Sequence, residues 1–112
     1  EVDTSDEICA DHIITRLRKT RGASIAVIDY LQLLDQRRST ADLDQQMAAL
    51  KQHTETSGDI IVAISQIDRS FEATTKKLPD LSDIRLPNPV DLGRFTRTCF
   101  LHDGVVEFNK AR

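Results

Sequence analysis

Two polar residues follow apolar segments of the chain, at positions where a parallel sheet collects its ligands. Asp29 closes the segment 24–29 (SIAVID), and Gln66 follows the segment 59–64 (DIIVAI). Ligands of open parallel sheets bind at the carboxyl ends of the strands, so Asp29 and Gln66 are the first candidates for a site. A carboxylate held at a rigid strand end can lie near the Mg²⁺ of a bound nucleotide. The alternative for Asp29 is an ordinary turn residue after a strand.

The elements around these two residues predict how they are positioned. Both segments are apolar at almost every position, which predicts inner strands of a parallel sheet that are buried on both faces. Residues 40–57 carry apolar side chains at helical spacing, and Gly58 predicts the end of that helix. Strand, helix and strand in this order predict a right-handed βαβ unit. Asp29 and Gln66 are therefore expected at the same edge of the sheet.

The remaining segments are predicted from the same kind of pattern. Residues 5–20 have helical periodicity, and residues 90–95 predict one helical turn. Residues 68–88 show no period and predict a long loop, which we expect to be mobile. Residues 98–108 predict a hairpin, because Asp-Gly separates two apolar runs. This hairpin is expected to extend the parallel strands into one mixed sheet of at least four strands, with Phe100 and Phe108 in its core.

Composition limits the classes of protein. With 112 residues and 39% hydrophobic residues, the chain is expected to form one domain or a piece of one, and its net charge of −3 gives no overall basic field for DNA. No apolar run approaches the roughly 18 residues of a membrane span, and no signal peptide is recognisable, so we expect a cytoplasmic protein without membrane contact. Cys9 and Cys99 are predicted to be buried free thiols.

Three motifs resemble those of the DnaB-type replicative helicases. Residues 28–34 (IDYLQLL) are similar to the Walker B segment of the family, and residues 63–70 (AISQIDRS) resemble its Ser-Gln-Leu-Asn-Arg segment. Residues 82–85 (SDIR) resemble the start of the family's loop that grips single-stranded DNA. The motifs stand in the family's order at compatible spacing, and the resemblance extends over roughly residues 8–112. It implies an α/β fold class: a RecA-like three-layer fragment with parallel strands and a C-terminal antiparallel hairpin.

The resemblance also implies roles for individual residues. Asp29 would hold Mg²⁺ through water, and Gln66 would sense the γ-phosphate of ATP and the DNA. Arg85 would contact the DNA strand. Lys110 and Arg112 stand where the family carries a Lys-x-Arg pair that reaches the ATP of the neighbouring subunit. Gln66 and Arg112 are thus the candidates for catalytic groups, since an arginine fork can stabilise charge on a transferred phosphoryl group.

Simpler interpretations stand beside these roles. Arg112 can be a basic chain end, and Arg85 can be a solvated loop residue. Lys76 and Lys77 are candidates for DNA contacts, because a basic loop facing a channel attracts a strand, but a pair of solubility charges explains them too. Asp68 stands where the family usually has Asn, and Leu86-Pro87-Asn88 replaces the family's acidic residue and glycine.

The sequence contains no Gly-x-x-x-x-Gly-Lys-Ser/Thr, so the P-loop half of a RecA-like domain is absent from residues 1–112. Without that loop we expect no tight binding of ATP and no ATP hydrolysis by this chain alone. The leading hypothesis is the C-terminal part of an ATP-dependent DnaB-like DNA helicase motor, with ATP and Mg²⁺ as cofactors, single-stranded DNA as partner and a hexameric ring as assembly. The alternative is a degenerate RecA-like module that binds partners without ATPase activity.

Overall fold

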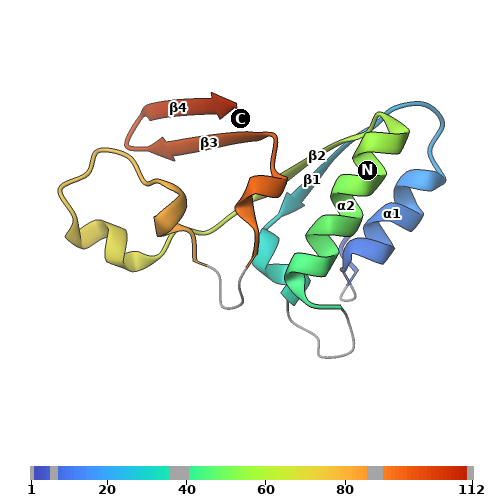
Figure 1. The fold of residues 1–112 in the computed structure, drawn as a ribbon, viewed down its shortest axis with the longest axis horizontal. Helices are drawn as coiled ribbons and strands as arrows, with labels where there is room; N and C mark the ends of the chain where they lie inside the picture. The colour runs from blue at the N-terminus through green and yellow to red at the C-terminus, as the bar shows by residue number, and fades with distance from the viewer. Residues whose placement is uncertain (1, 6–7, 36–40, 86–89, 111–112) are drawn as a thin grey trace.

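The part of the chain that the structure describes contains two α-helices and four strands, joined by short 3-10 helices (Figure 1). The computed structural model describes residues 2–5, 8–35, 41–85 and 90–110. In chain order the elements are α1 (Ala10–Arg18), β1 (Ile25–Asp29), η1 (Leu31–Asp35), α2 (Leu43–Ser57), β2 (Ile60–Ile64), η2 (Arg69–Ala73), η3 (Leu81–Asp83), η4 (Leu92–Arg94), β3 (Arg97–His102) and β4 (Val105–Lys110).

The βαβ unit predicted from the sequence is confirmed. Strands β1 and β2 pair in parallel, with Ile25 opposite Ile60 at one end and Asp29 opposite Ile64 at the other. Helix α2 begins after Asp42, whose side chain accepts a hydrogen bond from the Gln45 backbone N–H at 2.8 Å. It ends at Gly58, where φ is +78°, a left-handed conformation that favours glycine.

The core lies between the helices and one face of the β1–β2 sheet. Leu31, Leu34 and Leu43 are almost completely inaccessible, and five further apolar residues are buried with them: Ala10, Ile14, Ile28, Met47 and Leu50. Helix α1 is shorter than the predicted helix over residues 5–20, because its N-cap is Cys9 and its first turn is held from another element. The Ala10 backbone N–H donates to the Gln46 side-chain oxygen at 2.9 Å.

The prediction that both faces of the sheet are buried is wrong for this chain. Helices α1 and α2 pack on the same face, and the residues that alternate with that face are exposed: Ile25, Val27, Ile60, Val62 and Ile64. Among the described residues no element covers this second face. A strand that is apolar at every position can therefore have one bare face, and the sequence pattern does not distinguish the two cases.

The predicted hairpin is confirmed, and its turn has the expected chemistry. Strands β3 and β4 are antiparallel, and the turn residues Asp103 and Gly104 have φ values of +49° and +79°. Positive φ at both central residues is the signature of a type I′ turn, which Asp-Gly favours. With the parallel β1–β2 pair, this hairpin confirms the predicted α/β fold class.

The arrangement of the hairpin differs from the prediction in three respects. It forms a two-stranded sheet of its own, so the expected mixed sheet of four strands is not present in the part of the chain that the structure describes. Phe100 is buried, but Phe108 is 63% exposed. Cys99 lies opposite Phe108 on the same outer face and is also exposed, whereas Cys9 is half-buried. The two cysteines are free, as expected, but neither is fully buried.

The segment predicted as a structureless loop contains ordered turns. Helices η2 and η3 lie within it, and an isolated antiparallel bridge joins Ile67 to Ile84. The single turn predicted near residues 90–95 is present as η4. In the described segments, no helix has both the length and the apolar character needed to span a membrane.

Candidate functional site

The carboxyl ends of β1 and β2 bring the two leading candidates to one edge of the sheet. Asp29 pairs with Ile64 at the last register position, and Gln66 follows two residues later. Both side chains are exposed. The parallel pairing confirms the predicted placement, since adjacent parallel strands end together. The proposed roles of Asp29 and Gln66 remain predictions.

The segment after Asp29 is anchored firmly in the core. Leu31 and Leu34 of η1 are 2% and 1% exposed. The buried side chain of Gln46 on α2 donates to the backbone oxygens of Leu34 at 2.7 Å and of Ala41 at 2.9 Å. Because the same side chain also accepts from Ala10, it ties η1 to both helices and leaves none of its polar atoms unpaired. Asp29 is thus followed by a rigid element.

Gln32, the second residue of η1, contacts the next two segments of the candidate site. Its side-chain nitrogen donates to Ser65 Oγ at 3.1 Å and to the backbone oxygen of Arg85 at 2.5 Å. Its side-chain oxygen accepts from the backbone N–H of Gln66 at 3.4 Å. Sequence reasoning missed this residue, because its partners are 33 and 53 positions away along the chain.

The DNA-loop candidate Arg85 lies directly beside Gln66. The Arg85 backbone N–H donates to the Gln66 backbone oxygen at 3.0 Å, and the bridge between Ile67 and Ile84 continues this pairing. The Asp68 backbone N–H donates to the Asp83 backbone oxygen at 2.6 Å. The side chain of Arg85 is exposed. Two stretches separated by 19 positions, from Gln66 to Arg85, are therefore held together through their backbones.

Lys76 makes ion pairs within the loop. Its ammonium group lies 2.7 Å from a carboxylate oxygen of Asp83 and 3.2 Å from one of Asp80, and 5.9 Å from the centre of the Phe71 ring. The hydrogen bond with Asp83 is the main reason why the pKa of Lys76 is raised. Lys77 is exposed beside it. A DNA contact by Lys76 would compete with these ion pairs. Lys77 makes no ion pair with any described residue, so a DNA contact by Lys77 would have no such competitor.

Two carboxylates of the loop cap its short helices. Asp68 accepts from the Ser70 backbone N–H at 2.9 Å, and this bond is the main cause of its lowered pKa. Asp80 accepts two hydrogen bonds from Ser82, from the hydroxyl at 2.5 Å and from the backbone N–H at 2.9 Å. These two bonds, with a smaller contribution from Lys76, lower the pKa of Asp80 to about 2. The Asp68 that replaces the family's Asn thus has a local capping role.

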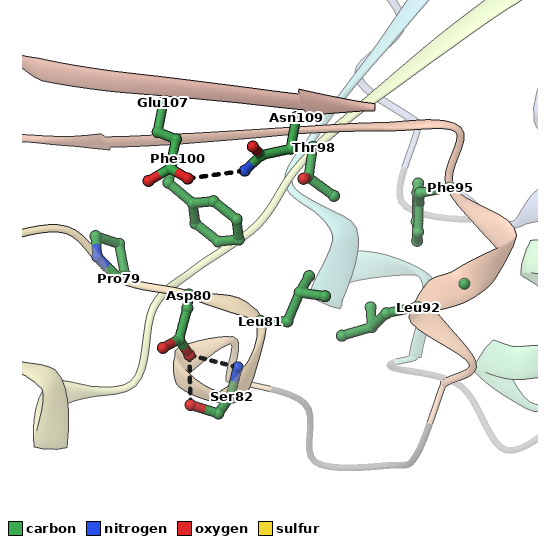
Figure 2. Close-up of a pocket in the computed structure, with 11 residues that line it drawn as sticks. Pro79, Asp80, Leu81, Ser82, Leu92, Phe95, Thr98, Phe100, Glu107 and Asn109 are labelled. Atoms are coloured by element: carbon green, nitrogen blue, oxygen red, sulfur yellow. Dashed lines mark hydrogen bonds between the residues drawn. The ribbon is translucent and has the colours of Figure 1, made fainter. Parts of the chain in front are cut away.

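A hollow of about 530 Å³ separates this loop from the hairpin (Figure 2). Leu81, Leu92 and Phe100 line it with apolar side chains, and Asp80 and Glu107 add two carboxylates to the lining. Glu107 accepts a hydrogen bond from the Asn109 amide at 3.2 Å. Two carboxylates repel phosphate, so the hollow is a poor candidate for the nucleotide or the DNA backbone.

The donor set of the candidate site fits Mg²⁺ only in company with a nucleotide. Among the described residues no group of three or more His, Cys, Asp or Glu side chains could hold a metal ion. Magnesium in nucleotide sites is commonly bound through one or two carboxylates together with phosphates and water, and Asp29 can supply one carboxylate. The predicted groups on Lys110 and Arg112 lie outside what the structure describes: the side chain of Lys110 and the whole of Arg112.

Comparison with known proteins gives a consistent family. A model described as the DnaB-like helicase C terminal domain matches residues 2–90. The replicative DNA helicase DnaB of Helicobacter pylori strain J99 is 31% identical over 112 aligned positions, which cover 89% of this chain and 23% of that protein. The replicative DNA helicase DnaB of Mycoplasma pneumoniae is 33% identical over 88 positions, which cover 73% of this chain and 18% of that protein.

The similarity is limited to part of each relative. The replicative DNA helicase DnaB of Geobacillus stearothermophilus is 32% identical over 78 positions, which cover 62% of this chain and 16% of that protein. The chain therefore spans less than a quarter of the length of the curated relatives it matches. No solved structure matches it at a significant level. The family model matches most of the chain, and the chain belongs to the family of DnaB-like helicase C-terminal domains.

Proposed function

We propose that this chain is the part of an ATP-dependent DnaB-like DNA helicase motor that connects the nucleotide to the DNA. Asp29 stands on the Mg²⁺ side, Gln66 senses the γ-phosphate, and Arg85 contacts a single DNA strand. One observation supports this assignment above the others: Gln66 follows the strand next to Asp29, and its backbone oxygen accepts a hydrogen bond from Arg85 at 3.0 Å. A residue so placed contacts the nucleotide end of the sheet on one side and the DNA loop on the other.

The nucleotide side depends on groups that this sequence does not contain. Bound Mg²⁺ would neutralise charge on the phosphates of ATP, with Asp29 holding it through water. A P-loop would have to come from outside residues 1–112, because the sequence has no such motif. In the assembled motor, which we propose to be a hexameric ring, Lys110 and Arg112 would reach the ATP of the adjacent subunit.

The DNA side rests on local charge, because the net charge of the chain is −3. Arg85 and Lys77 are exposed basic residues on the same loop region. Lys76 would join them only by leaving Asp83 and Asp80. We therefore expect weak binding of single-stranded DNA that depends strongly on salt.

Salt-dependent binding of a fluorescent oligodeoxythymidine to the 112-residue chain tests the DNA contact. Replacing Arg85 with Ala should lower the slope of log affinity against log salt concentration by about one, the amount typical of one lost phosphate contact. Arg18→Ala is the matched control, because Arg18 is exposed at the end of α1. An unchanged slope in Arg85→Ala, or an equal loss in Arg18→Ala, contradicts the assignment of Arg85.

The coding sequence upstream of Glu1 separates the motor from the partner-binding module. An intact P-loop with its lysine there supports the motor, and a P-loop without that lysine favours the module. For the chain alone we expect no phosphate release from ATP. Release that depends on Mg²⁺ and disappears in Asp29→Ala would contradict the assignment of the P-loop to another segment.

A further inference from the structure

Both the oxygen and the nitrogen of the Gln32 carboxamide form hydrogen bonds, and only one orientation of the group allows all of them. The Gln66 backbone N–H can only donate, and the Arg85 backbone oxygen can only accept. The side-chain oxygen of Gln32 must therefore face Gln66 and its nitrogen must face Arg85, as the hydrogen bonds show. The second nitrogen-bound hydrogen is directed to Ser65 Oγ. No carboxylate could replace this group at neutral pH, because a carboxylate has no hydrogen to donate.

Gln32 connects a rigid segment to a weakly anchored one. On its own side, Leu31 and Leu34 are almost completely buried, and Gln46 holds the Leu34 oxygen at 2.7 Å. On the other side, no residue from 65 to 85 belongs to the buried apolar cluster of the βαβ unit or packs against it. The contacts of Gln32 therefore supply fixed points for the exit of β2 and for the base of the Arg85 loop.

We propose that Gln32 is a positioning residue, whose carboxamide holds Gln66 and Arg85 in one register and so transmits movement between the nucleotide end of the sheet and the DNA loop. The inference rests on the proposed function for its DNA side, but the ordering of the loop can be measured without DNA. Gln32 touches neither proposed ligand itself; it acts through the backbones of Gln66 and Arg85.

Amide hydrogen exchange of the 112-residue chain, without DNA, tests the ordering. In Gln32→Ala the amides of Gln66 and Arg85 should exchange about tenfold faster, the effect expected when about one hydrogen bond's worth of local stability is lost. The Val27 amide of β1 should not change. Gln52→Ala, at an exposed position of α2, is the control and should change none of these amides. Unchanged exchange at Gln66 and Arg85 in Gln32→Ala overturns the proposal.

Two further variants distinguish hydrogen bonding from packing. Gln32→Met keeps the length of the side chain and removes its hydrogen bonds, so it should behave like Gln32→Ala. Gln32→Glu keeps the acceptor and loses the donor, and it should regain protection of Arg85, relative to intrinsic exchange, as acidification protonates the new carboxyl group and restores a donor. A Gln32→Met variant with normal protection, or a Gln32→Glu variant without this pH dependence, overturns the proposal.

DNA binding then separates the failure of this inference from that of the proposed function. The side-chain amide resonance of Gln32 should shift when oligodeoxythymidine is added to the chain, and it should not shift in Arg85→Ala. If Arg85→Ala binds as well as the original chain, the proposed function fails, and the exchange data still decide the ordering role. If Arg85→Ala weakens binding while Gln32→Ala loosens the loop without any loss of affinity, the positioning role is overturned.

Discussion

Eight of the eleven buried apolar residues in the described structure lie in the βαβ unit and α1, and the other three are Phe71, Pro79 and Phe100. We call residues 8–35 and 41–64 the core unit, and residues 65–85 and 97–110 the loop and hairpin unit. The core unit is stabilised by apolar packing. The loop and hairpin unit is held by backbone pairing, by the ion pairs of Lys76 and by an edge-to-face contact between Phe71 and His102 at 5.0 Å.

This difference predicts where the chain can move. Apolar packing is lost cooperatively, whereas a loop held by exposed hydrogen bonds can open by itself. The segment that would contact DNA belongs to the second kind. The side chain of Gln32 links it to the core unit, and the pair of Asp44 with Arg94, at 3.1 Å, links the segment before the hairpin to α2. Substitutions in the core unit should therefore change global stability, and substitutions in the loop should change local opening.

The largest effect is expected from Leu34→Ala in the core unit. Leu34 is 1% exposed, and truncation of such a residue costs about 3 kcal/mol in the free energy of unfolding, from lost burial and the cavity that remains. Urea denaturation followed by circular dichroism measures this change. The matched control is Leu101→Ala, because Leu101 is 65% exposed on the hairpin and its truncation should cost no more than about 0.5 kcal/mol. Equal losses of unfolding free energy in the two variants would contradict the difference in packing between the core unit and the hairpin.

The second effect concerns the buried polar pair that closes the core unit. Asp59 accepts from the Ser24 N–H and lies 2.7 Å from the ring nitrogen of His53, and these bonds, the first above all, lower its pKa. A lowered carboxyl pKa contributes stability that is present above the ordinary value of 3.8 and is lost as the pH falls through the folded-state value. Asp59→Asn should lower the urea midpoint at neutral pH and flatten its decline in acid. Asp11→Asn, at an exposed position, serves as control. If the urea midpoint depends on pH in the same way in the original chain, Asp59→Asn and Asp11→Asn, the role of Asp59 is refuted.

A smaller and purely local effect is expected from Lys76→Met. The change removes the ion pairs with Asp80 and Asp83, so the amides of the η3 turn should exchange faster while the urea midpoint stays the same. The adjacent Lys77→Met is a close control, because it removes the same charge from the same loop. A shift of the urea midpoint in Lys76→Met alone would show that the loop unfolds together with the core unit.

The smallest effect is the acid titration of the η3 cap. The pKa of Asp80 is lowered from 3.8 to about 2, chiefly by its hydrogen bonds with Ser82, so the cap is intact above the ordinary value and is lost as the pH falls from 3.8 to about 2. Exchange of the Ser82 amide, corrected for its intrinsic pH dependence, should rise in that interval. In Asp80→Asn this rise should be absent, and a rise that persists there would assign the titration to another carboxyl group.

Local patterns in the sequence were sufficient to predict the βαβ unit and the hairpin. Each of the patterns involved depends on neighbours within a few positions: the two apolar runs that end at Asp29 and before Gln66, the helix end at Gly58, and the Asp103-Gly104 turn. Their physics is contained in short segments, so the shared edge of Asp29 and Gln66 could be predicted.

The rest depends on contacts between distant positions. Gln32 belongs to the segment that resembles the Walker B motif and Gln46 to a predicted helix, but neither pattern gives these side chains a role. Their importance comes from partners that the fold brings to them. Which face of β1 and β2 is covered is likewise decided by where α1 packs, and a run of aliphatic residues carries no information about that. The capping bonds of Asp68 and Asp80 occur in a segment that has no periodicity, so only the structure reveals them.

The bare face of the β1–β2 sheet has a consequence for the colloidal behaviour of the chain. Ile25, Val27, Ile60, Val62 and Ile64 form a contiguous aliphatic surface, and each of the two strands has an outer edge that no described strand pairs with. Open edges beside an exposed aliphatic surface are a template for aggregation. The weight-average molar mass of the purified chain, measured by static light scattering, should therefore rise with protein concentration, and a charged residue in place of Val62 should suppress that rise.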